Sequence, residues 1–134
     1  MDIAERVLDN KLVHGCCCSE NILKMALEDM GWEPEAHTAW IKSMGAFCGG
    51  LHEGLACGAL CAANSVLWAV AEEKKKAKEE LGPEFMSWFK ERFGSWDCAD
   101  ILEGDESRKT TFCPTLTADT YLKLYDMLED IGAV

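Results

Sequence analysis

The segment LACGALCAANSVLWAVA, residues 55–71, is almost continuously apolar. It is shorter than the roughly 20 residues that a transmembrane helix needs, and Gly58, Asn64 and Ser65 interrupt it. An apolar segment of this kind is instead typical of a helix buried inside a protein core. We therefore expect a central helix over about 55–80, with the rest of the fold packed around it and no membrane partner.

Apolar residues recur at helical spacing through almost the whole chain, and no segment shows the alternation typical of a β-strand. Gly82-Pro83 is expected to end the central helix and open the next, Gly94 to end that one, and Pro114 to open the last. A chain of 134 residues can bury a hydrophobic core without disulfides. The sequence therefore predicts an all-α fold, a single-domain bundle over residues 1–134 with about five or six helices.

Charge narrows the classes of partner. The chain has 13 basic and 24 acidic residues and a net charge of −11, which would repel the phosphates of nucleic acid. The first residues, MDIAERVLDN, lack the basic start and apolar core of a signal peptide, so we expect a cytoplasmic protein. In a reducing compartment, eight cysteines indicate metal binding or redox chemistry before structural disulfides, although small buried core residues are the alternative.

Four of the cysteines, Cys18, Cys57, Cys98 and Cys113, lie near four predicted helix starts. The unpaired N–H groups and partial positive charge of a helix start favour a thiolate over a thiol. A shared metal or cluster site would need that environment. A small bundle has many helix ends, however, so the residues alone leave a shared site and a chance arrangement equally open.

The other candidates are weaker. Cys61 lies four residues after Cys57, a spacing that suits one metal ion but is also ordinary core packing. Cys48 opens a glycine-bearing loop and is expected to be a bystander, whereas His52 in that loop is an alternative ligand or proton carrier. In the run Cys16-Cys17-Cys18, neighbouring side chains point in different directions, so the three cannot easily serve one centre.

Four motifs in order carry a resemblance to a known family. They are CCSENIL at 17–23, CGGLHEGLACGALCA at 48–62, FGSWDCADIL at 93–102 and FCPTL at 112–116. From end to end the chain resembles the C_GCAxxG_C_C family, which is regarded as redox-active. The resemblance implies that Cys18, Cys57, Cys98 and Cys113 are the family cysteines and that they have a redox or metal role.

Two positions depart from the family pattern. Ala62 replaces the last glycine of CGAxxG, which affects only a close helix contact because alanine is also small. Cys17 replaces an asparagine before the first family cysteine, so it could tune or resolve the site, while Cys16 is expected to be a bystander.

These observations predict first an iron–sulfur protein, in which the four cysteines hold a cluster that passes single electrons to a protein redox partner. Such a chain would act as an oxidoreductase or an electron carrier, and a homodimer is reasonable. Three alternatives stay open at this point. They are a structural zinc site on the same cysteines, a metal-free thiol–disulfide protein with Cys17 or Cys61 resolving a bond to Cys18 or Cys57, and a helical partner-binding module with inert cysteines.

Overall fold

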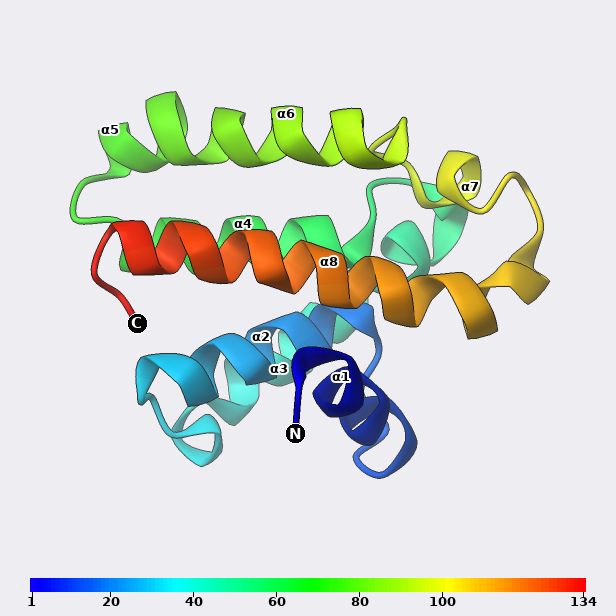
Figure 1. Ribbon diagram of the computed structural model, residues 1–134, viewed down its shortest axis with the longest axis horizontal. Coiled ribbons are helices and arrows are strands. Elements are labelled where there is room, and N and C mark those ends of the chain that lie inside the picture. Colours follow the sequence, from blue (N-terminus) through cyan, green and yellow to red (C-terminus); the bar gives the residue numbers. More distant parts are fainter.

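Helix α4 (Gly58–Val70) packs against three other long helices of the computed structural model, which describes residues 1–134. These are α2 (Cys18–Met30), α6 (Gly82–Phe93) and α8 (Lys109–Asp130). In the view of Figure 1, α6 forms one layer, α4 and α8 form the middle, and α2 lies on the opposite side. The expected all-α fold is confirmed.

Shorter elements complete the chain. They are α1 (Ile3–Leu12), a 3₁₀ turn (Pro34–His37), α3 (Thr38–Met44), a second 3₁₀ turn (Gly45–Phe47), α5 (Lys74–Lys76), α7 (Cys98–Ile101) and a third 3₁₀ turn (Glu106–Arg108). Helix α1 packs on α8 and α2. No helix has both the length and the apolar character that crossing a bilayer requires.

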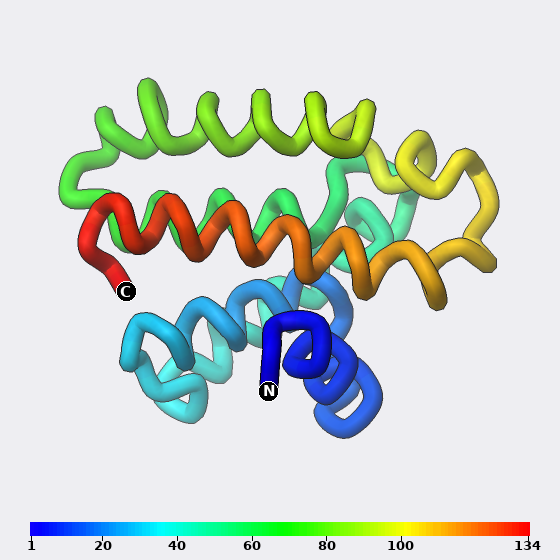
Figure 2. Tube along the Cα trace, viewed as in Figure 1, coloured from blue at the N-terminus to red at the C-terminus, as the bar shows by residue number.

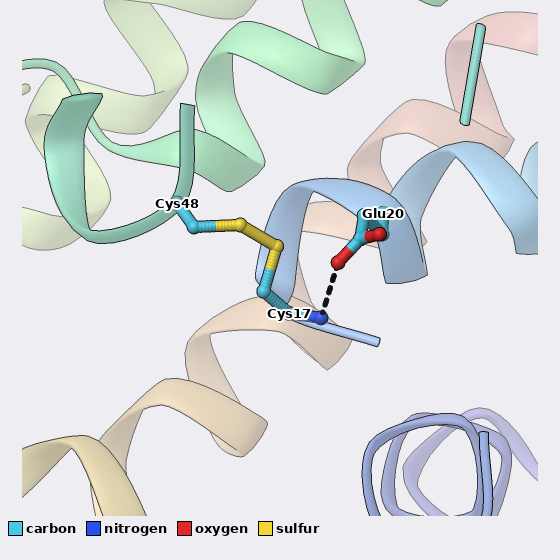
Figure 3. Close-up of side chains that lie close together, drawn as sticks. All are labelled: Cys17, Glu20 and Cys48. Carbon is cyan, nitrogen blue, oxygen red and sulfur yellow. Dashed lines mark hydrogen bonds between the residues drawn. A yellow bond between two sulfur atoms is a disulfide. The ribbon is translucent and has the colours of Figure 1, made fainter. Parts of the chain in front are cut away.

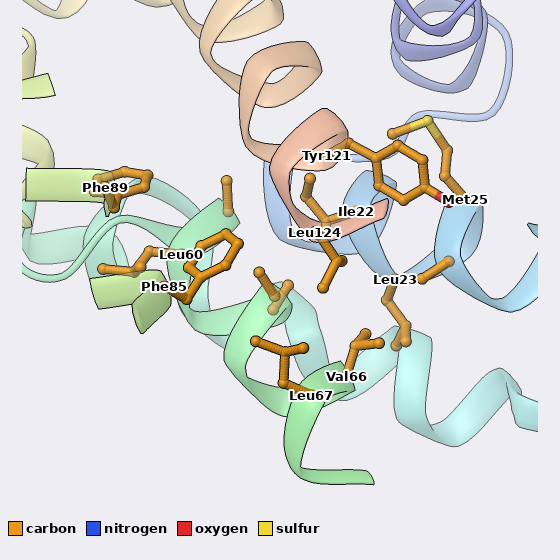
Figure 4. Packing of buried hydrophobic residues seen from close by; sticks show 14 of the residues in the cluster. Ile22, Leu23, Met25, Leu60, Val66, Leu67, Phe85, Phe89, Tyr121 and Leu124 are labelled. Carbon is orange, nitrogen blue, oxygen red and sulfur yellow. The ribbon is translucent and has the colours of Figure 1, made fainter. Parts of the chain in front are cut away.

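One hydrophobic core of 23 buried residues joins the long helices. Figure 4 shows its centre, where side chains from α2, α4, α6 and α8 meet. The residues labelled there are buried: Ile22, Leu23, Met25, Leu60, Val66, Leu67, Phe85, Phe89, Tyr121 and Leu124. Burial of so many large apolar groups supplies the main driving force for folding.

The helix expected over 55–80 is wrong in its bounds. Helix α4 ends at Val70, and after a turn the chain folds back along α4 as one helical run over 74–93 (Figure 2). Gly82-Pro83 lies inside this run and does not break it. A π-helical turn precedes Gly82, whose N–H reaches the carbonyl of Ala77 five residues back, and this wider turn accommodates the proline.

A polar contact ties α1, α2 and α8 together beside the core. The hydroxyl of Tyr121 donates to a carboxylate oxygen of Asp29, and the guanidinium of Arg6 lies 3.0 Å from the same oxygen. Burial, followed by the bond to Asp29, raises the pKa of Tyr121, so the hydroxyl keeps its proton.

Candidate functional site

A cavity of about 440 Å³ lies at one end of the bundle, where α2 and α4 begin next to α7 and the first turns of α8 (Figure 1). Every cysteine of the chain except Cys61 contributes to its wall. The wall therefore contains the four cysteines selected from the sequence, which we call the four-cysteine site: Cys18, Cys57, Cys98 and Cys113. Their role as metal ligands stays a prediction.

Three of these four cysteines lie at helix starts, as expected. Cys18 is the first residue of α2, Cys57 caps α4, and Cys98 is the first residue of α7. Cys113 is the exception, because α8 begins at Lys109 and Pro114 lies inside it.

The reason for the difference at α8 is a cap upstream of the proline. The Asp105 side chain accepts the N–H of Ser107, which starts the 3₁₀ turn Glu106–Arg108 that leads directly into α8. Pro114 is the sixth residue of α8, beyond the first turn, so the helix continues through it without a hydrogen bond from position 114 to the carbonyl of Thr110. Cys113 therefore reaches the cavity from the side of a helix and lacks the N–H groups of a helix start.

A single antiparallel bridge fixes two of the cysteines side by side. It pairs Ala56 with Asp97. The N–H of Cys57 donates to the carbonyl of Trp96 at 2.8 Å, and the N–H of Cys98 donates to the carbonyl of Leu55 at 2.7 Å. The starts of α4 and α7 are therefore held together by backbone hydrogen bonds.

Gly58 allows α4 to approach α2. A Cβ atom at this position would lie 2.7 Å from the carbonyl oxygen of Phe47 and 3.0 Å from the sulfur of Cys18. The glycine after the second family cysteine is thus required for steric reasons. No local pattern in the sequence predicts this role, because Phe47 and Cys18 approach Gly58 only in the folded chain.

Burial dominates the protonation of the metal-free thiols. It raises the pKa of Cys57 strongly and that of Cys18, with further increases from neighbouring thiolate charge. Burial also raises the pKa of Cys113 to about 11, and the charges of Cys18 and Cys98 add to this effect. The sulfurs are close enough to influence one another, and the thiols would lose protons on binding a metal.

Several groups at the site favour the thiolate form. Backbone N–H groups of Ser19, Ala59 and Gly49 act on the Cys18 sulfur and lower its pKa, although burial outweighs them. Lys109 lowers the pKa of Cys98, whose largest shift is again a rise from burial, and its ammonium lies in the cavity wall together with that of Lys11. Glu106 also lines the cavity and pairs with Lys109 at 3.4 Å, so the lining has one more lysine than acidic residues in a chain with a net charge of −11.

The sulfurs of the four-cysteine site are not drawn together around a single point. No three sulfurs of the four-cysteine site lie within 4.8 Å of one another. Around one zinc ion with bonds of about 2.3 Å in a tetrahedron, thiolate sulfurs would be roughly 3.8 Å apart. In this structure the four sulfurs are therefore spread more widely around the cavity than the ligands of one tetrahedral ion, and backbone N–H groups act on those of Cys18 and Cys57.

The structure contains a disulfide between Cys17 and Cys48 (Figure 3). Their Cα atoms are 6.1 Å apart, although the residues are 31 positions apart in the sequence. The hydroxyl of Ser19 lies 3.2 Å from the sulfur of Cys17 and 3.3 Å from that of Cys48. The expectation that Cys48 is a bystander is therefore wrong, and Cys17 pairs with it and not with Cys18 or Cys57.

Glu20 completes the surroundings of the disulfide. Its carboxylate accepts the N–H of Cys17 at 3.1 Å. Cys17, Glu20 and Cys48 are the only three side chains of ligand type in the structure whose donor atoms all lie within 4.8 Å of one another. In the disulfide form, however, neither cysteine offers a thiolate to a metal.

A left-handed turn follows Cys48. Four successive residues, 49–52, have φ angles between 60° and 63°, and the last two are Leu51 and His52. Left-handed backbone costs roughly 1–2 kcal/mol for each residue that is not glycine. His52 helps to hold the turn, since its Nε2–H donates to the carbonyl of Gly45 at 2.9 Å and only Nδ1 is left for another partner.

The remaining candidates are less central. Cys61 is partly buried outside the cavity wall, and its N–H donates to the Cys57 carbonyl within the helical ladder. It is neither one of the core residues nor one of the partly buried residues packed against them, so the core role favoured from the sequence is not confirmed. Cys16 does line the cavity, although the sequence indicated a bystander.

Comparison with known families identifies the chain. Residues 16–127, which include every cysteine, match the model of the family described as "Putative redox-active protein (C_GCAxxG_C_C)". The chain belongs to this family. No curated protein and no solved structure matches it. Membership of the C_GCAxxG_C_C family, together with the cysteine-lined cavity, supports a redox role for this chain.

Proposed function

We propose that the chain carries single electrons on an iron–sulfur cluster held by Cys18, Cys57, Cys98 and Cys113. The observation that carries this proposal is the convergence of four thiols, from four separate segments, on one cavity. When bound, such a cluster supplies a one-electron couple. The family description as redox-active agrees with the proposal.

The surrounding residues suit an anionic group of this kind. The starts of α2 and α4 and the N–H groups at Cys18 offset negative charge, as do Lys11 and Lys109. Positive potential at the ligands raises a reduction potential, because it favours the state with one more electron. A protein redox partner would exchange electrons at the open side of the cavity, near the partly exposed Cys98.

Reconstitution without oxygen tests the proposal. The reduced chain is incubated with ferrous iron and sulfide, desalted, and analysed for bound iron, sulfide and visible absorption. We expect a brown protein with stoichiometric iron that reductant bleaches. A colourless, iron-free protein after this treatment would contradict the proposal.

A pair of serine variants gives the test its specificity. C18S removes a proposed ligand, while C16S removes a neighbouring cavity cysteine that is not one. We expect C18S to lose iron binding and C16S to keep it. Equal iron content in the two variants would show that the four-cysteine site is wrongly assigned.

A further inference from the structure

The Cys17–Cys48 disulfide is not needed to hold this fold together. The chain already buries a hydrophobic core of 23 residues, and domains of this size fold without covalent links. Both cysteines lie in the cavity wall and are partly exposed. A disulfide that the fold does not need, and that other thiols can reach, is suited to thiol–disulfide exchange.

Ser19 fits both oxidation states of the pair. Its hydroxyl donates to the carbonyl of Met44 at 2.7 Å, so its oxygen faces the two sulfurs as an acceptor. In the disulfide form, the fully buried hydroxyl is already satisfied by Met44. After reduction, the same oxygen can accept the S–H of either thiol without moving. The reduced and oxidised pairs therefore both avoid an unpaired buried polar group.

The segment after Cys48 contains strained backbone close to the disulfide. Leu51 and His52 adopt left-handed backbone directly downstream of the disulfide. Strain of this kind in non-glycine residues is concentrated at functional sites. The unusual backbone beside the Cys17–Cys48 bond therefore agrees with a functional role for this part of the cavity wall.

We propose that Cys17 and Cys48 form a thiol–disulfide exchange centre that acts on disulfide-bonded substrates. A dithiol reductant converts the pair to two thiols and is itself oxidised to a disulfide. One thiolate of the reduced pair then attacks a sulfur of the substrate disulfide, which forms a mixed disulfide and expels a substrate thiolate. The other cysteine attacks the mixed disulfide, so that the Cys17–Cys48 bond forms again and the second substrate thiol leaves.

The reaction is tested with the metal-free chain, so the outcome does not depend on the iron–sulfur proposal. The protein is equilibrated with dithiothreitol under native conditions, freed of it, and labelled with a maleimide for mass spectrometry. Six cysteines are free in the disulfide form, and we expect two more to label after reduction. Adding a disulfide substrate should return the count to six free cysteines while substrate thiols appear.

Two substrates distinguish the source of the disulfide. Oxidised glutathione represents small molecules, and insulin represents proteins, since reduction of its interchain bonds precipitates one chain. Reoxidation of the pair by either substrate supports the proposal, and the faster one identifies the class. If neither substrate reoxidises the reduced pair, or if the bond resists dithiothreitol until the chain is unfolded, the disulfide is structural and the proposal is overturned.

Serine variants assign the chemistry to these two residues. C17S and C48S should each reduce the rate of substrate reduction roughly tenfold or more, and one of them should retain a trapped mixed disulfide. C61S is the matched control, because Cys61 lies outside the cavity wall, and it should react like the wild type. Equal rates in all four proteins would overturn the proposal. So would zinc binding by the reduced wild type that is lost in C48S and occurs without any exchange, because Cys17, Glu20 and Cys48 would then be a metal site.

Discussion

Gly58 packs directly against the sulfur of Cys18, and the space between them is too small for a side chain. A Cβ atom there would be 3.0 Å from this sulfur and 2.7 Å from the carbonyl oxygen of Phe47. Because a backbone oxygen cannot rotate away, G58A should push α4 away from the turn Gly45–Phe47 and from the start of α2, and lower the free energy of unfolding by about 1–3 kcal/mol. Urea unfolding would measure the loss, and iron uptake should fall with it.

Gly45 provides the control for this substitution. A Cβ atom there meets no atom within 4 Å, and its φ of −56° suits any residue. We expect G45A to change the free energy of unfolding by no more than about 0.5 kcal/mol. If G58A proved as stable as G45A, the close approach at Cys18 would not be a real constraint.

The left-handed turn predicts a stabilising substitution. Leu51 has a φ of 61° and is 42% exposed, so glycine there removes backbone strain and little packing. L51G should raise the free energy of unfolding by about 0.5–1 kcal/mol. L55G is the matched control, since Leu55 is also exposed but has a φ of −85°, and it should lower the stability by a similar amount. Thermal or urea unfolding would measure both changes. If both variants lost stability, the left-handed conformation at Leu51 would be contradicted.

The metal-free, reduced chain should lose stability at alkaline pH. Burial and neighbouring thiolates raise the pKa of Cys113 from its ordinary value of 9.0 to about 11. Between these values the unfolded chain has released a proton that the folded chain still holds, so the contribution is complete below pH 9 and falls as pH rises to 11. Urea unfolding at about pH 8 and about pH 10 should show this loss, with a smaller one in C113S. A stability that rose through this window would contradict the buried, protonated thiol.

The contact between Tyr121 and Asp29 should matter for stability and not for the cavity. Y121F leaves the Asp29 carboxylate with only Arg6 as a partner, which should cost about 1.5–3 kcal/mol of unfolding free energy. Iron uptake per folded chain should be unchanged, because none of these residues lines the cavity. Y125F removes a hydroxyl on the same helix that makes no side-chain hydrogen bond, so it should cost less than about 0.5 kcal/mol. Chemical unfolding of both variants would test the difference.

Much of the helical architecture could be predicted because its signals are local. Apolar spacing and the glycine at position 94 are read from neighbouring residues, and the helix α6 does end there. The turn after Val70 contains no glycine or proline, so no local signal predicts it. Helix α4 ends there because the next helical segment packs back against it. Pro114 predicted a helix start that is not there, because the Asp105 cap begins a turn upstream that leads into the last helix at Lys109.

The candidate site also contains features that local sequence predicts and features that only the folded chain brings together. Cys18, Cys57 and Cys98 could be placed at helix starts because caps leave a sequence pattern. The bridge between Ala56 and Asp97 could not, because two single residues far apart in the chain pair without any periodic signal. The partner of Cys17 was missed for the same reason, since a disulfide depends on Cα atoms that only the folded chain brings together.

The walls of the cavity come from distant parts of the chain, so its cysteines emerge at different times during synthesis. Cys17, Cys18 and Cys48 emerge first, and Cys98 and Cys113 follow 50 and 65 residues after Cys48. At a translation rate of roughly 5–20 residues per second, the first and last cysteines of the four-cysteine site are separated by about 5 to 20 seconds. A nascent chain can therefore pair Cys17 with Cys48 before the cavity has its last two walls. A cofactor that needs all four cysteines can therefore bind only after Cys113 has emerged, 65 residues later than Cys48.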